Sequence, residues 1–523
     1  MKLSHQTQTR LLLALVIIVA LVAHVLPAPR TIDDAFITFR YSRNLVEGEG
    51  FVYNPGVRTL GTTTPLYTVL MAGMSLVTGG QDFPWYALTI NAIAAAATAA
   101  FLFLLLVRVS NNLWLGTLGG VLWGVSPTSV TFAVGGMETA VNILWLVGAT
   151  WFFVADRRVW LGVFIGLAFL TRIDSVLWWG PLMLYQFGES LLLARRSRAQ
   201  PASTGWLAMI PWRTWLAALL VVMPWLLFAW AYFGSPVPNS LSAKTVAYIM
   251  PPGSAFIAFV RAYVVPFSES QLMGAVGVMV ALVFYMLLLI SGALYILRKY
   301  PRLLPFVLYP WLYLIVFSVA NPLVFRWYVA PPLPALMVTL LIGAWRILDS
   351  IGQQRRLPAL IAAAGLSLLW VSTSLAGWEL RPDHGPQRPA PEMAWHQIEL
   401  YYEQIGTQLH EEYGVTAQTP VASADIGAVG YFSQATIIDT VGLVTPELSA
   451  YYPVDPALIV SEQNYAIPPQ LIYDTAPDYL VTMEAFVRLG LEQETEFHDR
   501  YSLAREIPTS FYGTGMRLYE AVR

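Results

Sequence analysis

The sequence predicts an α-helical, polytopic membrane domain followed by a separate α/β domain outside the membrane. Apolar residues make up 56% of the 523 residues and charged residues 12%, whereas about 25% of a soluble globular chain is charged. Residues 1–378 have 23 Lys and Arg against 11 Asp and Glu, a net charge of +12. Residues 379–523 have 7 against 21, a net charge of −14. These opposite balances predict a membrane domain over 1–378 and an aqueous domain over 379–523.

Apolar runs of membrane-spanning length predict about eleven transmembrane helices. The first run, Leu11–Leu26, lacks a small-residue cleavage site, which favours an uncleaved span over a signal peptide. A shorter run, Pro65–Thr78, is interpreted as a juxtamembrane or re-entrant helix. The eleven runs lie near 11–28, 84–107, 112–130, 137–155, 158–171, 174–194, 213–233, 272–297, 303–320, 328–348 and 358–377.

The distribution of basic residues predicts the orientation. With eleven spans and a cytoplasmic N-terminus, the basic clusters all fall on the cytoplasmic side, as the positive-inside rule requires. The loop 30–64 and the C-terminal domain then face the outside of a bacterial cytoplasmic membrane. Clusters that set this orientation include Lys2/Arg10, Arg157/Arg158, Arg298/Lys299 and Arg355/Arg356.

The region after Trp378 has the pattern of a small α/β domain. A Pro-rich linker at 381–393 leads into a predicted amphipathic helix over 391–413. The segments PDYLVTM and TGMRLYEAV alternate as strands do. Asp425 and Asp439 follow short apolar runs, where an acid either caps a turn or faces a ligand. The tail has no basic stripe, which argues against nucleic acid as a partner.

Two adjacent acids, Asp33 and Asp34, begin the polar segment that follows the first span. Ionisable groups at a membrane boundary point to chemistry at the interface. A transferase that uses a lipid-linked sugar needs a general base for the acceptor hydroxyl, and either acid could serve. The alternative is structural, because Thr31-Ile32-Asp33-Asp34 also matches a helix capping box.

Such a transferase also needs cations to hold the phosphate of its lipid donor. Four are predicted on the outer side, each with an alternative. Arg40 either binds phosphate or neutralises the aspartates. Arg172 either binds phosphate or forms a buried pair with Asp174. Lys244 either binds phosphate or is a solvated loop charge, and Arg326 either binds it or reaches the headgroups. Substrate contacts are expected from Tyr41, Glu138, Asp174 and Asn239.

The segment DDAFITFRYSRNLVEGEGFVYNPGVRTLGTTTP resembles the first extracytoplasmic loop of the GT-C glycosyltransferases, most closely the actinobacterial terminal β-(1→2) arabinofuranosyltransferases. GGMETA, TRIDS, PNSLSAK and ADIGAVGYFSQATIIDTVGLV resemble further motifs of that group. The resemblance implies a GT-C fold, a polyprenyl-phosphate sugar donor, an extracytoplasmic glycan acceptor and an inverting displacement. Asp33 and Asp34 occupy its paired-acid position. Thr63, Thr64 and Ile173-Asp174 depart from the pattern of some members.

The resemblance leaves the sugar, the cofactor and other classes of function open. Arabinofuranose is the best expectation, with mannose or an aminosugar, transferred to protein or lipid, as the alternative. Some GT-C enzymes use a divalent metal such as Mg²⁺ or Mn²⁺, for which Asp33, Asp34 and Glu138 are candidate ligands. A transporter would place ionisable groups near the membrane midplane and show repeated halves, and neither is evident. A scaffold whose acids merely cap helices is the remaining alternative.

Overall fold

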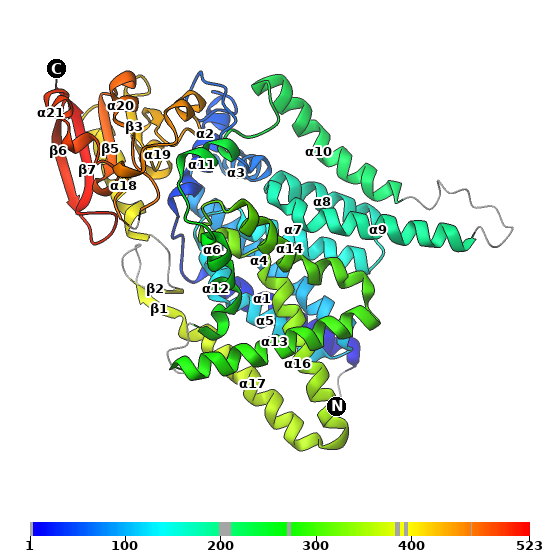
Figure 1. The fold of residues 1–523 in the computed structure, drawn as a ribbon. Coiled ribbons are helices and arrows are strands. Elements are labelled where there is room, and N and C mark those ends of the chain that lie inside the picture. The colour runs from blue at the N-terminus through cyan, green and yellow to red at the C-terminus, as the bar shows by residue number, and fades with distance from the viewer. Residues whose placement is uncertain are drawn as a thin grey trace.

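The computed structural model describes residues 4–197, 211–268, 274–381, 388–391, 396–461 and 463–522. A large helical domain forms most of the molecule, and a smaller domain containing a β-sheet lies at one end of it (Figure 1, orange and red). The N-terminus lies far from this smaller domain, toward the opposite end of the helical bundle (Figure 1). Much of the predicted linker, at 382–387 and 392–393, falls outside the described residues.

The helical domain contains seven helices that are long and apolar enough to cross a membrane, within the part of the chain that the structure describes. An eighth results if α5 and α6, which meet at a 45° bend, form one span. The prediction of a polytopic helical membrane domain is therefore confirmed, while the number eleven stays a prediction. The helices are α1 (His5–Val25), α2 (Asp33–Glu47), α3 (Pro65–Thr78), α4 (Phe83–Ser110), α5 (Leu113–Val125), α6 (Pro127–Val134), α7 (Thr139–Val154), α8 (Arg158–Thr171), η1 (Ile173–Ser175), α9 (Val176–Ser197), α10 (Trp212–Phe233), α11 (Ser240–Ala247), α12 (Ser254–Ser268), α13 (Gly274–Lys299), η3 (Pro301–Leu303), α14 (Leu304–Ala320), α15 (Arg326–Val329), α16 (Leu333–Gln354) and α17 (Arg356–Ala376).

One predicted span, 112–130, is broken in the structure. Ser126 has φ −58° and ψ 127°, an extended conformation between α5 and α6. The following Pro127 accounts for the break, because proline disfavours helical geometry in the residue before it. The short helix predicted at Pro65–Thr78 is present as α3 with the same bounds.

The C-terminal domain is α/β, as predicted. Its five-stranded sheet has the order β4-β3-β5-β7-β6, with β3 parallel to β4 and β5 and with β7 antiparallel to β5 and β6. The two segments predicted as strands form β5 and β7. The elements are the hairpin β1 (Trp378–Arg381) and β2 (Arg388–Pro391), then α18 (His396–Glu411), β3 (Pro420–Ser423), α19 (Gly427–Ser433), β4 (Thr436–Asp439), η4 (Pro446–Tyr451), η5 (Pro456–Leu458), α20 (Pro469–Thr475), β5 (Tyr479–Met483), η6 (Glu484–Phe486), η7 (Leu491–Gln493), α21 (Thr495–Arg500), β6 (Tyr501–Pro508) and β7 (Gly515–Ala521).

The two domains meet where the polar segment after α1 packs on the C-terminal domain. Helix α19 lies against α2 and is covered on another side by α18. The loop that contains α11 reaches the same junction, close to α2 (Figure 1). Most residues predicted for the functional site therefore lie at or near this junction.

Candidate functional site at the domain junction

Asp33 holds the C-terminal domain against the first loop. Its Oδ1 accepts a hydrogen bond from the N–H of Ala428 at 2.7 Å, and its Oδ2 accepts one from the N–H of Gly427 at 3.0 Å. Those N–H groups open α19 and have no partner within their own helix. The capping-box alternative is wrong in detail, because the residue that caps α2 is Ile32, without a side-chain bond. Asp33 instead caps a helix of the other domain.

Two glycines allow α19 to approach this closely. A Cβ atom at Gly427 would overlap the carbonyl group of Asp33, and one at Gly430 would overlap the hydroxyl of Tyr53 and Nη1 of Arg40. The Tyr53 hydroxyl also donates a hydrogen bond to the carbonyl of Ile426. The spacing Gly-x-x-Gly places both small residues on the face of α19 that contacts the first loop.

Arg40 has a structural role, so the prediction that it binds the donor phosphate is wrong. Its side chain is 1% exposed. It donates to the carbonyls of Tyr53 (2.9 Å), Gly430 (2.7 Å) and Ala435 (2.5 Å) and to Asn54 Oδ1 (3.2 Å). These bonds use all three guanidinium nitrogens within protein, so Arg40 ties the first loop to the C-terminal domain.

Tyr41 and Asn239 were predicted to contact substrate, and the structure gives both a different role. Tyr41 is buried, and its hydroxyl donates to the carbonyl of Thr59 (2.8 Å) and accepts from the N–H of Gly61 (3.0 Å). Asn239 donates through Nδ2 to the carbonyls of Gly442 (2.6 Å) and Leu443 (3.1 Å). Tyr41 thus shapes the first loop, and Asn239 anchors the α11 loop to the C-terminal domain.

Asp34 and Lys244 are the predicted residues that face each other at the junction. Nζ of Lys244 lies 3.7 Å from Oδ2 of Asp34, and the side chains are 25% and 29% exposed, respectively. Burial by itself lowers the pKa of Lys244, but Asp34, with smaller effects of Tyr328 and Asp439, outweighs burial and raises that pKa overall. Lys244 is therefore cationic at neutral pH, and Asp34 is the more accessible of the two adjacent acids.

Lys244 also contacts an aromatic ring, that of Phe325, in the segment just before α15. Nζ of Lys244 lies 4.8 Å from the ring centre of Phe325, close enough for a cation–π contact. The next residue, Arg326, is exposed. A second potential ligand for an anion thus follows the ring that Lys244 contacts, and the phosphate role of Arg326 stays a prediction.

Arg172 lies in a buried ion-pair network, which is the structural alternative given for it from the sequence. It donates to Glu138 Oε1 at 2.9 Å and to both carboxylate oxygens of Asp174 at 3.0 and 2.8 Å. The Tyr313 hydroxyl also donates to Asp174. The guanidinium lies 4.8 Å from the ring centre of Tyr328 in α15. Glu138, Asp174 and Arg172 therefore bind one another rather than a substrate, and they support α15.

Asp439 has the turn-capping role that the sequence left open, whereas a ligand-facing role of Asp425 stays a prediction. Asp439 accepts hydrogen bonds from the N–H groups of Val441 (2.9 Å) and Val444 (3.0 Å), so it caps a turn.

Asp425 instead accepts a bond from the Tyr402 hydroxyl at 2.7 Å and lies within electrostatic reach of Asp34 and Lys244. Nothing in the sequence identified Tyr402 as its partner, because α18 is brought to β3 by tertiary packing.

The predicted metal ligands do not fit a shared metal site. Over the described ranges, no three His, Asp or Glu side chains gather in a way that could hold a metal ion. Both oxygens of Asp33 accept backbone hydrogen bonds, Asp34 faces Lys244, and Glu138 pairs with Arg172. Each of the three predicted metal ligands is therefore engaged by another group of the protein.

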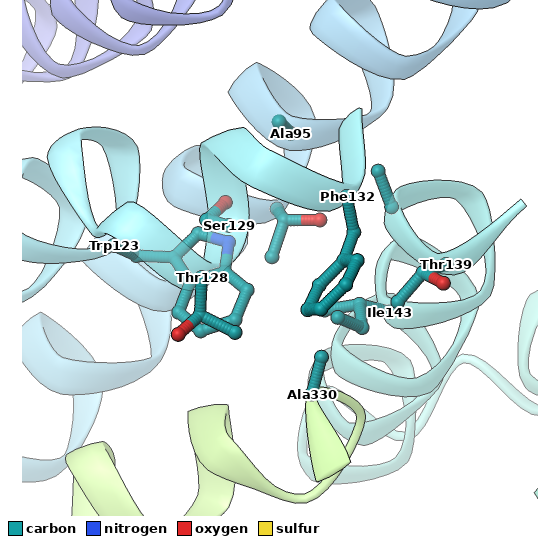
Figure 2. A pocket seen from close by; sticks show the side chains of 10 residues that line it. Ala95, Trp123, Thr128, Ser129, Phe132, Thr139, Ile143 and Ala330 are labelled. Atoms are coloured by element: carbon teal, nitrogen blue, oxygen red, sulfur yellow. The ribbon is translucent and has the colours of Figure 1, made fainter. Parts of the chain in front are cut away.

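A small cavity lies inside the membrane domain, and one of its lining residues, Thr139, directly follows Glu138 in the chain. Figure 2 shows it between the helices around Phe132, with Ala330 on one side. Its volume is about 10 Å³, room for roughly one water molecule. The Thr139 hydroxyl, which has no hydrogen-bond partner among the described residues, is among its lining groups. None of the predicted site residues lines it, and a cavity with room for one water molecule is too small to hold a sugar.

Comparisons with known proteins fit this architecture. Residues 391–520 match a family described as a domain of unknown function (DUF8728). Over 236 residues the chain is 27% identical to the terminal β-(1→2)-arabinofuranosyltransferase of Mycobacterium tuberculosis. That match covers 41% of this chain and spans about a third, 35%, of the relative's length.

Two solved structures share the fold over nearly the whole chain. One is the archaeal oligosaccharyltransferase AglB from Archaeoglobus fulgidus, determined with an inhibitory peptide and a dolichol-phosphate. It has a TM-score of 0.57, 12% identity, and coverage of 98% of this chain and 74% of AglB. The other is ArnT from Cupriavidus metallidurans bound to undecaprenyl phosphate, with a TM-score of 0.55, 12% identity, and coverage of 99% and 98%. The chain is thus a multi-pass membrane protein with the fold of the GT-C glycosyltransferases.

Proposed function

We propose that this protein is an inverting glycosyltransferase that moves a sugar from a polyprenyl phosphate to a glycan outside the cytoplasmic membrane. The observation on which this rests most is the contact between Asp34 and Lys244, an accessible acid beside a cation at the domain junction. The fold and the named relative support the same class of reaction. We further propose that the N-terminus is cytoplasmic and that the C-terminal domain faces outward.

In this proposal Asp34 is the general base. The acceptor hydroxyl oxygen attacks the anomeric carbon, and its proton passes to the carboxylate of Asp34. The bond between the anomeric carbon and the phosphate oxygen breaks at the same time, and the phosphate leaves with the electron pair. A single displacement inverts the anomeric configuration. Asp33 is unsuited to this role because both of its oxygens accept hydrogen bonds from α19.

Lys244 would hold the donor phosphate and stabilise its developing charge. When the lipid phosphate binds, it would replace Asp34 as the partner of Lys244 and release the carboxylate for the acceptor. Arg326 is exposed and directly follows Phe325, whose ring Lys244 contacts. It would provide a second cation for the phosphate. The proposed base is thus on α2, and the two cations proposed for the phosphate are on α11 and α15.

The name of the relative favours arabinofuranose as the sugar. A second candidate function is the transfer of another sugar, such as mannose or an aminosugar, to protein or lipid. The similarity of the fold to an oligosaccharyltransferase favours it. A panel of radiolabelled polyprenyl-phosphate sugars, incubated with the purified protein and followed by linkage analysis of the products, distinguishes them. We expect transfer with the arabinofuranosyl donor, and transfer only from another donor would replace that sugar in the proposal.

The two aspartates provide the test of the mechanism. Asp34→Asn should reduce kcat by about 100-fold or more, the typical contribution of a general base, while donor binding persists. Asp33→Asn should lower the melting temperature, because it weakens the hold on α19. If Asp34→Asn retains full activity while Asp33→Asn abolishes kcat without loss of stability, the assignment of the base is wrong.

A further inference from the structure

Asp425 lies beside the proposed base, although the two acids belong to different domains. It is in the turn between β3 and α19, two residues before Gly427. The N–H of Gly427 binds Asp33, whose chain neighbour is Asp34. Asp34 and Asp425 therefore flank the same contact between the domains. This places a carboxyl group of the C-terminal domain within electrostatic reach of the pair formed by Asp34 and Lys244.

The carboxyl group of Asp425 is held in position and is only partly used by the protein. Its Oδ2 accepts the bond from the Tyr402 hydroxyl at 2.7 Å, and the side chain of Tyr402 is fully buried. Its Oδ1 has no hydrogen-bond partner among the residues that the structure describes. Asp425 itself is partly exposed. One oxygen is thus fixed, and the other is available to a ligand.

The charges around Asp425 indicate which ligand suits it. Burial raises the pKa of Asp425 to about 6, the bond from Tyr402 lowers it, Asp34 raises it, and Lys244 lowers it. Two acids near one lysine would repel a phosphate at Asp425. A neutral hydroxyl, in contrast, donates well to a carboxylate oxygen. The environment therefore favours a sugar hydroxyl over the phosphate of the donor.

We propose that Asp425 is an acceptor-binding residue, whose Oδ1 accepts a hydrogen bond from a hydroxyl group of the acceptor sugar next to Asp34. This inference rests on the proposed function, because it takes Asp34 as the base that receives the acceptor proton. It makes the C-terminal domain a part of the active site. Tyr402 is then a positioning residue that fixes the carboxyl group of Asp425.

The test measures acceptor and donor kinetics separately with the full-length protein in detergent. The probes are an arabinofuranosyl polyprenyl phosphate and a synthetic arabinofuranosyl oligosaccharide with an octyl tail. Asp425→Ala should raise the acceptor KM about tenfold, as expected for a lost hydrogen bond to a charged group, and change the donor KM by less than about twofold. Tyr402→Phe should raise the acceptor KM less, because the carboxyl group remains.

A matched control lies in the same domain. Asp474 in α20 accepts a hydrogen bond from the Tyr451 hydroxyl at 2.7 Å, the same pairing as that of Asp425, but is not near Asp34 or Lys244 in any described contact. Asp474→Ala should leave both KM values unchanged. If Asp425→Ala has the same acceptor KM as Asp474→Ala, or affects donor and acceptor alike, the inference is wrong.

Two further measurements separate the possible failures. If Asp425→Ala does not fold, Asp425→Asn is judged by the same two KM values. If the wild-type protein transfers no sugar, the proposed function fails. Binding of the oligosaccharide to the donor-free protein, followed by tryptophan fluorescence, then decides the role of Asp425. Equal binding by wild type and Asp425→Asn refutes that role, and weaker binding by Asp425→Asn alone, with Asp474→Asn unchanged, supports it.

Discussion

The amino group of Lys244 lies 3.7 Å from the carboxylate of Asp34, although α11 and α2 are far apart in the chain. Both side chains are about a quarter exposed. An ion pair with this exposure contributes about 0–1 kcal/mol to stability, so it does little to hold the domains together. The strong contacts at the junction come from buried groups instead. The pair can therefore separate at small cost when a ligand arrives.

Replacement of Lys244 tests whether this cation serves the donor. Lys244→Ala should raise the donor KM by about tenfold or more, because a point charge on phosphate is lost, and leave the acceptor KM unchanged. Lys244→Arg, which keeps the charge, should recover part of the donor affinity. Unfolding free energy should fall by less than about 1 kcal/mol in either variant. Equal increases in both KM values, measured at steady state, would reject the donor role.

The fold could be predicted from the sequence because its signals are local. Apolar runs were sufficient to predict a helical membrane domain, and the patterns after Trp378 were sufficient to predict a small α/β domain. Alternation identified β5 and β7. The break at Pro127 was missed because the run 112–130 is apolar enough on average to span a membrane, and mean hydropathy does not register the conformational effect of a proline within it.

The roles within the site could be predicted only in part. The sequence placed Asp33 and Asp34 together at a helix start, yet the difference between them depends on α19, which lies almost 400 residues later. Arg40 has the charge expected of a phosphate ligand, but its partners are three backbone carbonyls and the side chain of Asn54, which no local pattern reveals. The sequence left open whether Asp425 caps a turn or faces a ligand, and its electrostatic contact with Asp34 depends on domain packing that no local pattern reveals.

The structural role of Arg40 leads to a prediction that separates stability from substrate binding. Arg40→Met should lower the unfolding free energy by about 2–4 kcal/mol, because several buried carbonyls lose a charged donor. Arg40→Lys should recover little, since one ammonium group cannot reach the partners that a guanidinium spans. Denaturant titration of both variants provides the measurement. A normal stability together with a raised donor KM would return Arg40 to the role first predicted for it.

The close approach of α19 to the first loop predicts a specific sensitivity at its glycines. Gly427→Ala should destabilise the junction by about 1–3 kcal/mol, because the new Cβ atom overlaps the backbone of Asp33. Gly73→Ala, within α3, is the matched control, since a Cβ atom there meets open space. That change should be neutral or slightly stabilising, as alanine favours helix. Thermal unfolding of the two variants compares them, and equal melting temperatures would contradict the close packing described for Gly427.

The raised pKa of Asp425 predicts how stability depends on pH. Its pKa is about 6 in the folded protein against an ordinary value of 3.8, chiefly because of burial. A carboxyl group whose pKa is raised by folding stabilises the protein most below the ordinary value, and this contribution is lost as the pH rises through about 6.

Asp33 and Glu399 have raised pKa values as well, so they act in the same direction. The contribution of Asp425 is at most about 2–3 kcal/mol, reduced by its partial exposure. Asp425→Asn cannot titrate, so it should lose less stability than wild type between pH 4.5 and pH 7 in thermal unfolding. Identical pH profiles for wild type and Asp425→Asn would show that Asp425 does not titrate in this range.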